Sequence, residues 1–288
     1  MPASVTALED AVDQLGGTDR WIRGNAQTIA LLKAKGFDFR SKGAAGLVRD
    51  AIEMNNWPTD QSATDALIRA AIAEGLDLSA KVETRIGRDS KESAAIGSII
   101  AYFAAETGNV ALFERMLRDG YVRRMGKSLL NSAFSGGMGC EARIAQAIFD
   151  AGADPKATGG NGNALHSLRS DYGRCADAGS AKRTEMAAKL VALGVPLEAR
   201  DGINWTPLMG CNDFEVSKIL LKAGANPNAK GNDGTTVVLS VDDDRAALTL
   251  LRAGADPKAK DDDGTLRQQA RKRHWPGTLA WLDQHGVK

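Results

Sequence analysis

The stretch TPLMGCNDFEVSKILLKAGANPNAKGNDG, residues 206–234, runs directly into TTVVLSVDDDRAALTLLRAGADPKAKDDDG, residues 235–264. In each stretch an apolar run ends in the pattern AGA(N/D)P(N/K)A, so Gly224 and Gly254 lie 30 residues apart. The string AGADPKA also occupies residues 151–157. Self-similarity at such a period predicts an array of stacked structural repeats.

One repeat can be interpreted residue by residue as two short helices. Thr206 is a good N-cap and Pro207 suits the first helical position, so a short helix is expected from Leu208 to about residue 212. Asp213 can cap a second helix. The buried stripe of that second helix is supplied by Val216, Ile219 and Leu220. In the same way, one of Asp242, Asp243 and Asp244 is expected to cap the corresponding helix of the next repeat.

The end of the repeat is marked by residues that stop a helix. Gly224 can adopt the left-handed conformation, and Asn226-Pro227 prevents the helix from continuing. Asn232-Asp233-Gly234 then favours a tight turn. This order resembles the ankyrin repeat, whose pattern is roughly DGxTPLHxA, a glycine turn, a leucine-rich helix and GADxNA. The resemblance is close in the last third of the chain and loose before it.

A glycine that ends a helix marks the period along the chain. The markers are Gly36, Gly75, Gly120, Gly152, Gly194, Gly224, Gly254 and Gly286. Their spacings are 39, 45, 32, 42, 30, 30 and 32 residues. Because ankyrin arrays run at about 33 residues, the longer steps must contain insertions. The resemblance therefore implies an all-α fold, an ankyrin-repeat solenoid of about eight helix-turn-helix units joined by short β-hairpins.

The array is expected to fill the chain as a single domain. Residues 1–43 would form an N-terminal cap, residues 44–264 the internal repeats and residues 265–288 a C-terminal cap. Insertions are expected near residues 55–62, 76–95 and 169–182. In the second insertion, the alternation of Val82, Thr84 and Ile86 with charged neighbours predicts a projecting hairpin that turns near Gly87–Ser90.

The charge balance and the first residues indicate which partners and which cell compartment to expect. Over 288 residues, 37 Lys and Arg balance 36 Asp and Glu, so the net charge does not favour nucleic acid or an acidic membrane surface. No apolar run approaches the ~20 residues that span a bilayer. The first residues, MPASVTALEDAVDQLGG, are acidic where a signal peptide is basic and then apolar. We expect a cytoplasmic protein; the alternative is a periplasmic one whose signal peptide was removed.

Motifs for catalysis or cofactor binding are incomplete. Gly126-Lys127-Ser128 suggests a phosphate-binding loop, but Tyr121 stands where that loop requires its first glycine. His166 occupies the family's own histidine position, and the resemblance implies that its ring hydrogen-bonds backbone groups. The three histidines are too far apart in such an array to share a metal ion. We therefore expect no enzymatic activity, no cofactor and no metal ion.

The three cysteines fall in the inter-helix turns of three consecutive repeats. They are Cys140, Cys175 and Cys211. In a cytosolic protein all three are expected to be reduced thiols. Alternatively, the long loop around Cys175 could bring it within disulfide distance of either Cys211 or Cys140. Such a bridge would indicate an oxidising compartment.

The ankyrin resemblance implies a partner protein that is bound through the concave face, by hairpin tips and the exposed side of the first helices. Carried over by position, the connections between repeats contribute Lys156, Asn161, Arg200, Asp201, Asn204, Trp205, Lys230, Asn232, Asp233, Lys260 and Asp262. The insertions contribute Trp57, Arg85, Arg88, Tyr172 and Arg174. Trp and Arg often dominate protein interfaces. For Trp205 the alternative is packing on the neighbouring hairpin.

These expectations favour a non-enzymatic protein-binding module that is a monomer when unbound. A sharper form is an immunity-type inhibitor that neutralises a bacterial toxin or effector. A host-directed ankyrin effector is an alternative. A second alternative is an enzyme with its site in the irregular region of residues 40–130. A third is nucleic-acid binding through the basic cluster Arg267, Arg271, Lys272 and Arg273, which would weaken steeply with salt.

Overall fold

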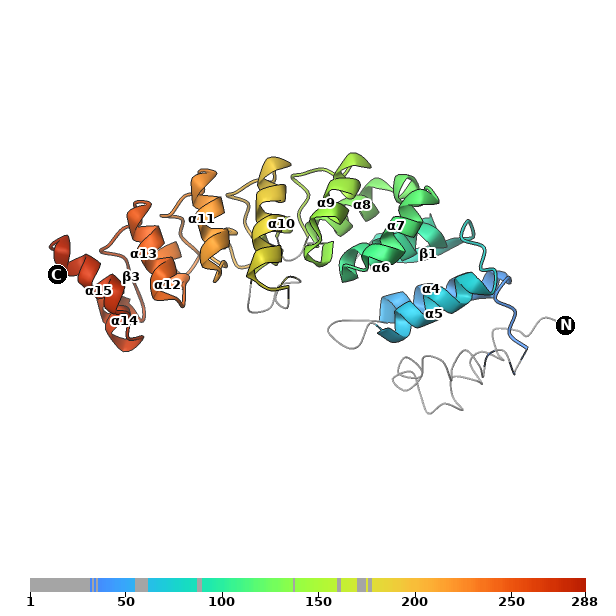
Figure 1. Cartoon of the computed structure of the whole chain (residues 1–288), viewed down its shortest axis with the longest axis horizontal. Coiled ribbons are helices and arrows are strands. Elements are labelled where there is room, and N and C mark those ends of the chain that lie inside the picture. Colours follow the sequence, from blue (N-terminus) through green and yellow to red (C-terminus); the bar gives the residue numbers. More distant parts are fainter. Residues whose placement is uncertain are drawn as a thin grey trace. The chain divides into compact units, whose positions relative to one another are not determined.

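The structure is a computed structural model, and it describes residues 32, 34, 36–54, 62–86, 90–136, 138–159, 162–169, 175 and 178–288. The chain divides into two compact parts, Met1–Gly126 and Lys127–Lys288. In the described residues both parts are mostly helical, and each includes one two-stranded antiparallel sheet (Figure 1). Among the described residues, no helix is long and apolar enough to cross a membrane.

The N-terminal part combines two helix pairs with a hairpin. Helices α4 (Lys42–Met54) and α5 (Ser62–Ala73) pack on each other, as do α6 (Ile96–Thr107) and α7 (Val110–Arg118). Between the pairs, β1 (Lys81–Ile86) and β2 (Ser90–Ala95) form an antiparallel hairpin in which Lys81 is opposite Ala95. The predicted antiparallel hairpin is therefore confirmed. Its predicted projection is not, because β1 packs on α4 and the hydroxyl of Thr84 donates to Glu53 of that helix at 2.9 Å. A short 3₁₀ turn, η1 (Val122–Arg124), ends this part.

The C-terminal part contains two rows of elements. The first row consists of helices and single turns of four to nine residues, and the second of helices of nine or thirteen residues that contact one another in chain order (Figure 1). The first row comprises α8 (Lys127–Ser135), η3 (Ala164–Leu168), α12 (Val237–Ser240) and α14 (Leu266–Lys272). The second comprises α9 (Ala142–Asp150), α10 (Ser180–Ala192), α11 (Phe214–Lys222), α13 (Asp244–Arg252) and α15 (Pro276–Gln284). The remaining elements are η2 (Met138–Cys140), β3 (Lys260–Asp261) and β4 (Gly264–Thr265).

The predicted helix from Leu208 to about residue 212 is wrong, because these residues form a turn. The amides of Met209 and Gly210 bond the carbonyl of Thr206, and the chain then reaches the cap Asp213. Six residues separate the two capping residues, and in the next repeat the same interval, between Thr236 and Asp243, holds only the four-residue α12. The predicted cap is confirmed: Asp213 accepts hydrogen bonds from the amides of Glu215 and Val216.

The marker glycines end their helices in one common geometry. All eight have positive φ, for example 102° at Gly224 and 94° at Gly254. After Gly224, the amide of Ala225 bonds the carbonyl of Leu220, and the same bond spans five residues after each of the other seven markers. This is the Schellman arrangement, which needs a left-handed residue at the glycine. The residue that accepts this bond also lies in the core, as Leu220 and Leu250 illustrate with 1% and 0% exposure.

Polar side chains join the turns that follow successive helices of the C-terminal part. Glu198 accepts from the amide of Asn226 at 2.8 Å. Asn228 accepts from the amide of Asp256 at 2.8 Å and donates to the carbonyl of Gly254 at 2.9 Å. These bonds satisfy backbone groups that the helix ends leave unpaired, and they fix the spacing of neighbouring turns.

Candidate interaction surface

The connections between helix pairs of the C-terminal part are tight hairpins. Gly159 and Gly162 form an isolated antiparallel bridge, as do Lys230 and Thr236. In the connection between them, the amide of Asp201 bonds the carbonyl of Trp205 at 3.1 Å. The last connection is the β3–β4 hairpin, where Lys260 pairs with Thr265. The candidate residues predicted in these connections thus lie on a set of hairpins of similar form.

Arg200 fastens two of these hairpins together. Its Nη1 donates to the carbonyl of Asn204 at 2.9 Å, within its own hairpin, and to the carbonyl of Lys230 at 2.8 Å, in the next one. Charge-assisted hydrogen bonds of this kind are the stronger ones. Arg200 is therefore a structural link between hairpins, although its side chain is exposed.

The tip of the 200–206 hairpin is rigidly built. One carboxylate oxygen of Asp201 accepts from the amides of Ile203 at 3.0 Å and Trp205 at 2.8 Å. Asn204 is left-handed, with φ 65°, a conformation that asparagine tolerates better than most residues. At this tip Ile203 is 53% exposed. Among the described residues, it is the one large hydrophobic side chain that is classed as exposed. Sequence reasoning missed Ile203; an isoleucine inside a Gly-x-Asn turn was the available signal.

Trp205 packs on the neighbouring hairpin, which was the alternative considered for it. Its side chain is half-buried, and the guanidinium carbon of Arg169 lies 5.3 Å from the ring centroid. A Cβ placed on Gly231 would come within 2.9 Å of the indole Nε1, so the indole lies directly against the backbone of that glycine. Arg169 also forms a buried ion pair with Asp201 at 3.9 Å. Trp205 therefore helps to hold the hairpins together; whether it also binds a partner stays a prediction.

His166 bonds backbone groups, as its position implied. Its Nδ1 lies 3.1 Å from the amide nitrogen of Asn163, so this ring nitrogen accepts. Its Nε2 lies 3.0 Å from the carbonyl of Trp205 and must donate. These two backbone contacts match a neutral imidazole protonated at Nε2. Nδ1 also lies 2.9 Å from the side-chain oxygen of Asn163. Burial lowers the pKa of His166, because the protonated ring would lose its hydration.

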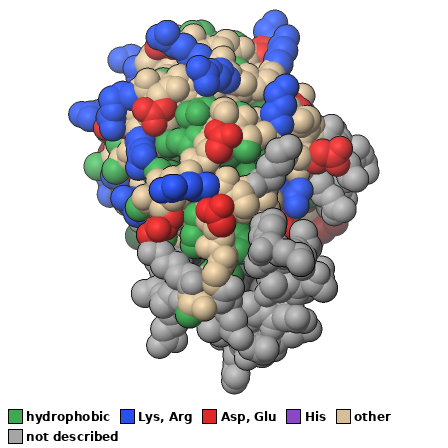
Figure 2. Space-filling view, turned by 90° about the vertical axis from the view of Figure 1, so that its right-hand side faces the viewer, with side chains coloured by type: hydrophobic (Ala, Val, Ile, Leu, Met, Phe, Trp, Pro, Cys, Tyr) green, Lys and Arg blue, Asp and Glu red, His purple; other side chains and the backbone are tan. Residues whose placement is uncertain are grey.

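The remaining candidates on the hairpins are exposed. They are Lys156, Lys230, Asn232, Asp233, Lys260 and Asp262. Hydrogen bonds from Thr235 lower the pKa of Asp233 and fix its turn. Arg85 lies in β1, whereas Trp57, Arg88, Asn161, Tyr172 and Arg174 lie outside the described residues. On the face drawn in Figure 2, basic and acidic side chains are interspersed around hydrophobic ones.

Two arginines of the basic cluster are engaged in local packing. Arg267 donates to the carbonyl of Val287 and pairs with Asp283 at 2.7 Å. Arg273 donates to the carbonyl of Val241 at 2.6 Å and lies over the ring of Trp275. The contacts of Arg267 join α14 to α15 and to the residue Val287 after it, whereas the bond of Arg273 joins the end of α14 to Val241, which follows α12. They reduce the basic charge that this cluster could offer to a phosphate backbone.

The cysteines differ from the expectation of three reduced thiols. Cys140 and Cys175 form a disulfide with their Cα atoms 5.2 Å apart, and Cys211 is a buried free thiol. The sequence left open which neighbour would pair with Cys175, because both occupy equivalent turns. In the structure, a turn of successive left-handed residues, from Met138 to Cys140, presents Cys140 to Cys175. Burial raises the pKa of the Cys211 thiol, which disfavours its reactive thiolate.

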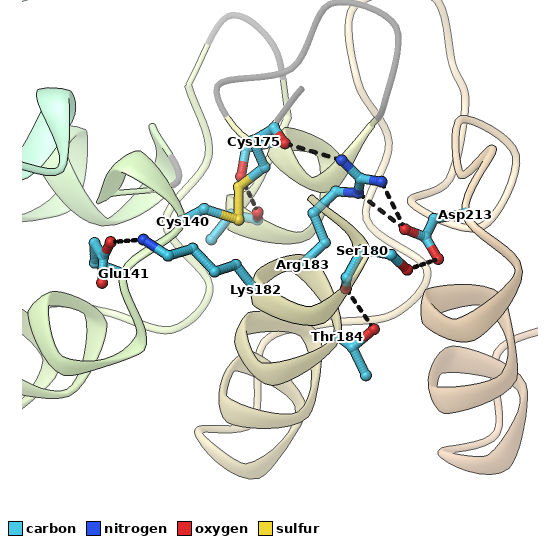
Figure 3. Close-up of a disulfide and its surroundings, with 10 residues drawn as sticks. Cys140, Glu141, Cys175, Ser180, Lys182, Arg183, Thr184 and Asp213 are labelled. Atoms are coloured by element: carbon cyan, nitrogen blue, oxygen red, sulfur yellow. Dashed lines mark hydrogen bonds and ion pairs between the residues drawn. A yellow bond between two sulfur atoms is a disulfide. The ribbon is translucent and has the colours of Figure 1, made fainter. Parts of the chain in front are cut away.

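Arg183 lies beside this disulfide and reaches the next helix (Figure 3). Its Nη1 donates to the carbonyl of Cys175 at 3.3 Å. Its Nε and Nη2 contact one carboxylate oxygen of Asp213 at 2.9 and 2.8 Å. The other oxygen of Asp213 accepts from the hydroxyl of Ser180 at 3.0 Å. On the opposite side of α10, Lys182 pairs with Glu141.

Within the part of the chain that the structure describes, no group of three or more His, Cys, Asp or Glu side chains could hold a metal ion. No protein-family model matches the sequence, and no curated protein matches it.

Proposed function

We propose that residues 127–288 are an ankyrin-type repeat array, with the helix pairs as its repeats. Three recurring features support this assignment: the Schellman ends of the helices, the row of second helices in chain order, and the polar links between successive turns. An array of this kind builds an extended surface from repeats that contact mainly their neighbours. The same interpretation extends to the helix pairs of residues 42–118.

We further propose that the protein is a non-enzymatic module that binds a partner protein through these hairpins. The observation that carries the proposal is the hairpin at residues 200–206. It presents Ile203 to solvent on a backbone fixed by Arg200 and Asp201. A rigid, exposed apolar side chain loses little entropy on binding and can fill a pocket of a partner. Exposed Lys230 and Asp233 on the next hairpin would supply polar contacts at the rim.

A sharper proposal is that binding neutralises the partner, as an immunity-type inhibitor does to a bacterial toxin or effector. An array that acts only by covering a site needs no catalytic group of its own. The disulfide supports an oxidising compartment, since such bonds persist outside the reducing cytosol. This favours the periplasmic alternative over the cytoplasmic expectation.

The test uses the full chain as bait in a lysate of its source organism, with captured proteins identified by mass spectrometry. An Ile203→Asp bait should recover about tenfold less of any stoichiometric partner than the natural chain, because a charge cannot enter an apolar pocket. The control is Lys222→Asp, which places the same carboxylate at another exposed position, at the end of α11. Equal recovery by the natural chain and Ile203→Asp would remove the 200–206 hairpin from the proposed interface.

A further inference from the structure

We infer that the Cys140–Cys175 disulfide is coupled through Arg183 to the N-terminal cap of α11. The oxidation state of this cysteine pair would then affect the stability of the start of α11, which follows the 200–206 hairpin. This inference stands independently of the proposed function. It concerns a device inside the C-terminal part of the chain, and Figure 3 shows its components.

The disulfide fixes Cys175 and Cys140 relative to each other. Cys175 is completely buried, and its amide bonds the carbonyl of Ser167 at 3.2 Å. Its partner Cys140 follows a turn in which Met138, Gly139 and Cys140 have φ values of 49°, 55° and 63°. Residues other than glycine adopt this region only at a cost in free energy. The covalent bond, which spans 35 residues, offsets that cost and restricts both segments.

The carbonyl of Cys175 links the disulfide to Arg183. It accepts from the amide of Ala178 at 3.1 Å and from Nη1 of Arg183 at 3.3 Å. Arg183 lies in the first turn and a half of α10, and its side chain is 11% exposed. Because a buried guanidinium is costly unless its hydrogen bonds are satisfied, the position of this carbonyl helps to fix the position of Arg183.

Arg183 in turn positions the group that caps the next helix. The side chain of Asp213 is only 4% exposed, and one of its oxygens takes both contacts from Arg183. The other oxygen accepts from the amides of Glu215 at 3.0 Å and Val216 at 3.4 Å, which are the first orphan donors of α11. One carboxylate thus serves both as ion-pair partner and as helix cap. Because both oxygens belong to one rigid carboxylate, a shift of Arg183 would move the capping oxygen, which the hydroxyl of Ser180 also holds at 3.0 Å.

The redox step is an ordinary thiol–disulfide exchange. On oxidation by glutathione disulfide, the Cys140 and Cys175 thiols lose two protons and two electrons and join through a new S–S bond. The S–S bond of the reagent breaks, and two glutathione thiols leave with those protons and electrons. A dithiol reductant reverses the step and ends as a cyclic disulfide. Both sulfurs lie in buried residues, so exchange requires local opening and should be slow in the native state.

The coupled elements flank the connection that the proposed function uses. Helix α10 ends at Ala192 and α11 begins at Phe214, and the 200–206 hairpin lies between them. Of the two helix starts, that of α11 follows the hairpin directly, so a weaker cap at Asp213 would loosen the segment on the C-terminal side of Ile203.

The test measures amide hydrogen exchange of the full chain in its oxidised form and in excess dithiothreitol. On reduction, the amides of Glu215 and Val216 should exchange about tenfold faster, the change expected when a charged cap is weakened. The internal control is α13, where Asp243 caps the amides of Arg245 and Ala246 in the same way but far along the chain from the disulfide. Exchange of these two amides should not change.

A variant separates coupling from general loosening. Arg183→Met should make Glu215 and Val216 exchange faster already in the oxidised form, and reduction should then add less than twofold, about 0.4 kcal/mol. Lys182→Met, which removes the neighbouring pair with Glu141, should keep the full response. Unchanged exchange at Glu215 and Val216 on reduction would overturn the inference, as would equal acceleration at Arg245 and Ala246. A free-thiol count on the natural chain, denatured without reductant, should find one thiol; a count of three would also overturn the inference.

Discussion

Asp244, in the first turn of α13, caps the N-terminus of α15 rather than that of its own helix. Its carboxylate accepts from the amides of Gly277 and Thr278, both at 2.8 Å, and from the hydroxyl of Thr278 at 2.6 Å. The N-cap residue of α15 is Trp275, which makes no side-chain cap bond. The cap of α15 is therefore supplied by a side chain of α13 and not by a neighbouring residue. This contact joins the last two helices of the second row.

Replacement of Asp244 by alanine should destabilise the C-terminal end of the chain. The change removes three hydrogen bonds and leaves the fully buried Thr278 hydroxyl without this acceptor. We expect the free energy of unfolding to fall by about 2 kcal/mol. Denaturant titration followed by circular dichroism measures it. Asp242→Ala is the matched control from the same acidic run: its side chain is 73% exposed and pairs with Arg273, so the loss should stay below about 1 kcal/mol.

Gly277 makes the approach of Asp244 possible. A Cβ at this position would lie 2.7 Å from Cδ1 of Leu248 and 2.9 Å from Oδ2 of Asp244. Although alanine is the better helix former, Gly277→Ala should therefore lower the free energy of unfolding by about 1–3 kcal/mol. The comparison is Gly46→Ala in α4, where the added Cβ meets no atom within 4 Å. There the helix propensity should prevail and raise the stability by up to about 1 kcal/mol.

Substitution of Trp205 should lower the stability of the chain, whereas substitution of Ile203 should leave it nearly unchanged. Trp205→Ala removes a half-buried ring that lies between Arg169 and Gly231. We expect a loss of about 2 kcal/mol in the free energy of unfolding, less than for a fully buried Trp. Ile203→Ala changes a largely exposed side chain and should alter stability by less than about 0.5 kcal/mol. A stability of Trp205→Ala equal to that of the natural chain would show that the ring contributes little to holding the hairpins.

The features that the sequence predicts well are those set by neighbouring residues. The marker glycines, the cap Asp213 and the β1–β2 hairpin depend on local backbone chemistry, and the structure confirms them. One of the three aspartates at 242–244 was expected to cap the helix that follows them, and Asp243 does so. Its neighbour Asp244 caps a helix more than 30 residues away, a role that no local pattern encodes.

The candidate site was predictable in position but less so in the role of each residue. The connections were located from the spacing of glycines and prolines, yet Arg200 and Trp205 contact the next hairpin, and Ile203 is the side chain left exposed. Which groups are covered depends on how neighbouring helix pairs are spaced. The pairing of Cys175 depended in the same way on the left-handed turn at Cys140.

His166 should make the stability of the chain depend on pH. Burial lowers its pKa below the ordinary value of 6.5, so the unfolded chain binds this proton more tightly than the folded chain does. The contribution of the neutral ring is therefore fully present above about pH 6.5 and is lost as the pH falls from there toward the folded pKa. Protonation of Nδ1 removes the acceptor for the amide of Asn163 and makes this nitrogen a donor that faces the side-chain oxygen of Asn163 at 2.9 Å.

Denaturant titrations between pH 7.5 and pH 5 measure this effect. The free energy of unfolding of the natural chain should fall by up to about 1.4 kcal/mol for each pH unit below the unfolded pKa. His166→Gln keeps a polar side chain at this position but cannot titrate, so its stability should be lower at pH 7.5 and should change less with pH. Subtracting the two curves removes the contribution of the carboxylates, which both proteins share. A difference between the proteins that does not vary over this pH range would mean that His166 titrates alike in the folded and unfolded chains.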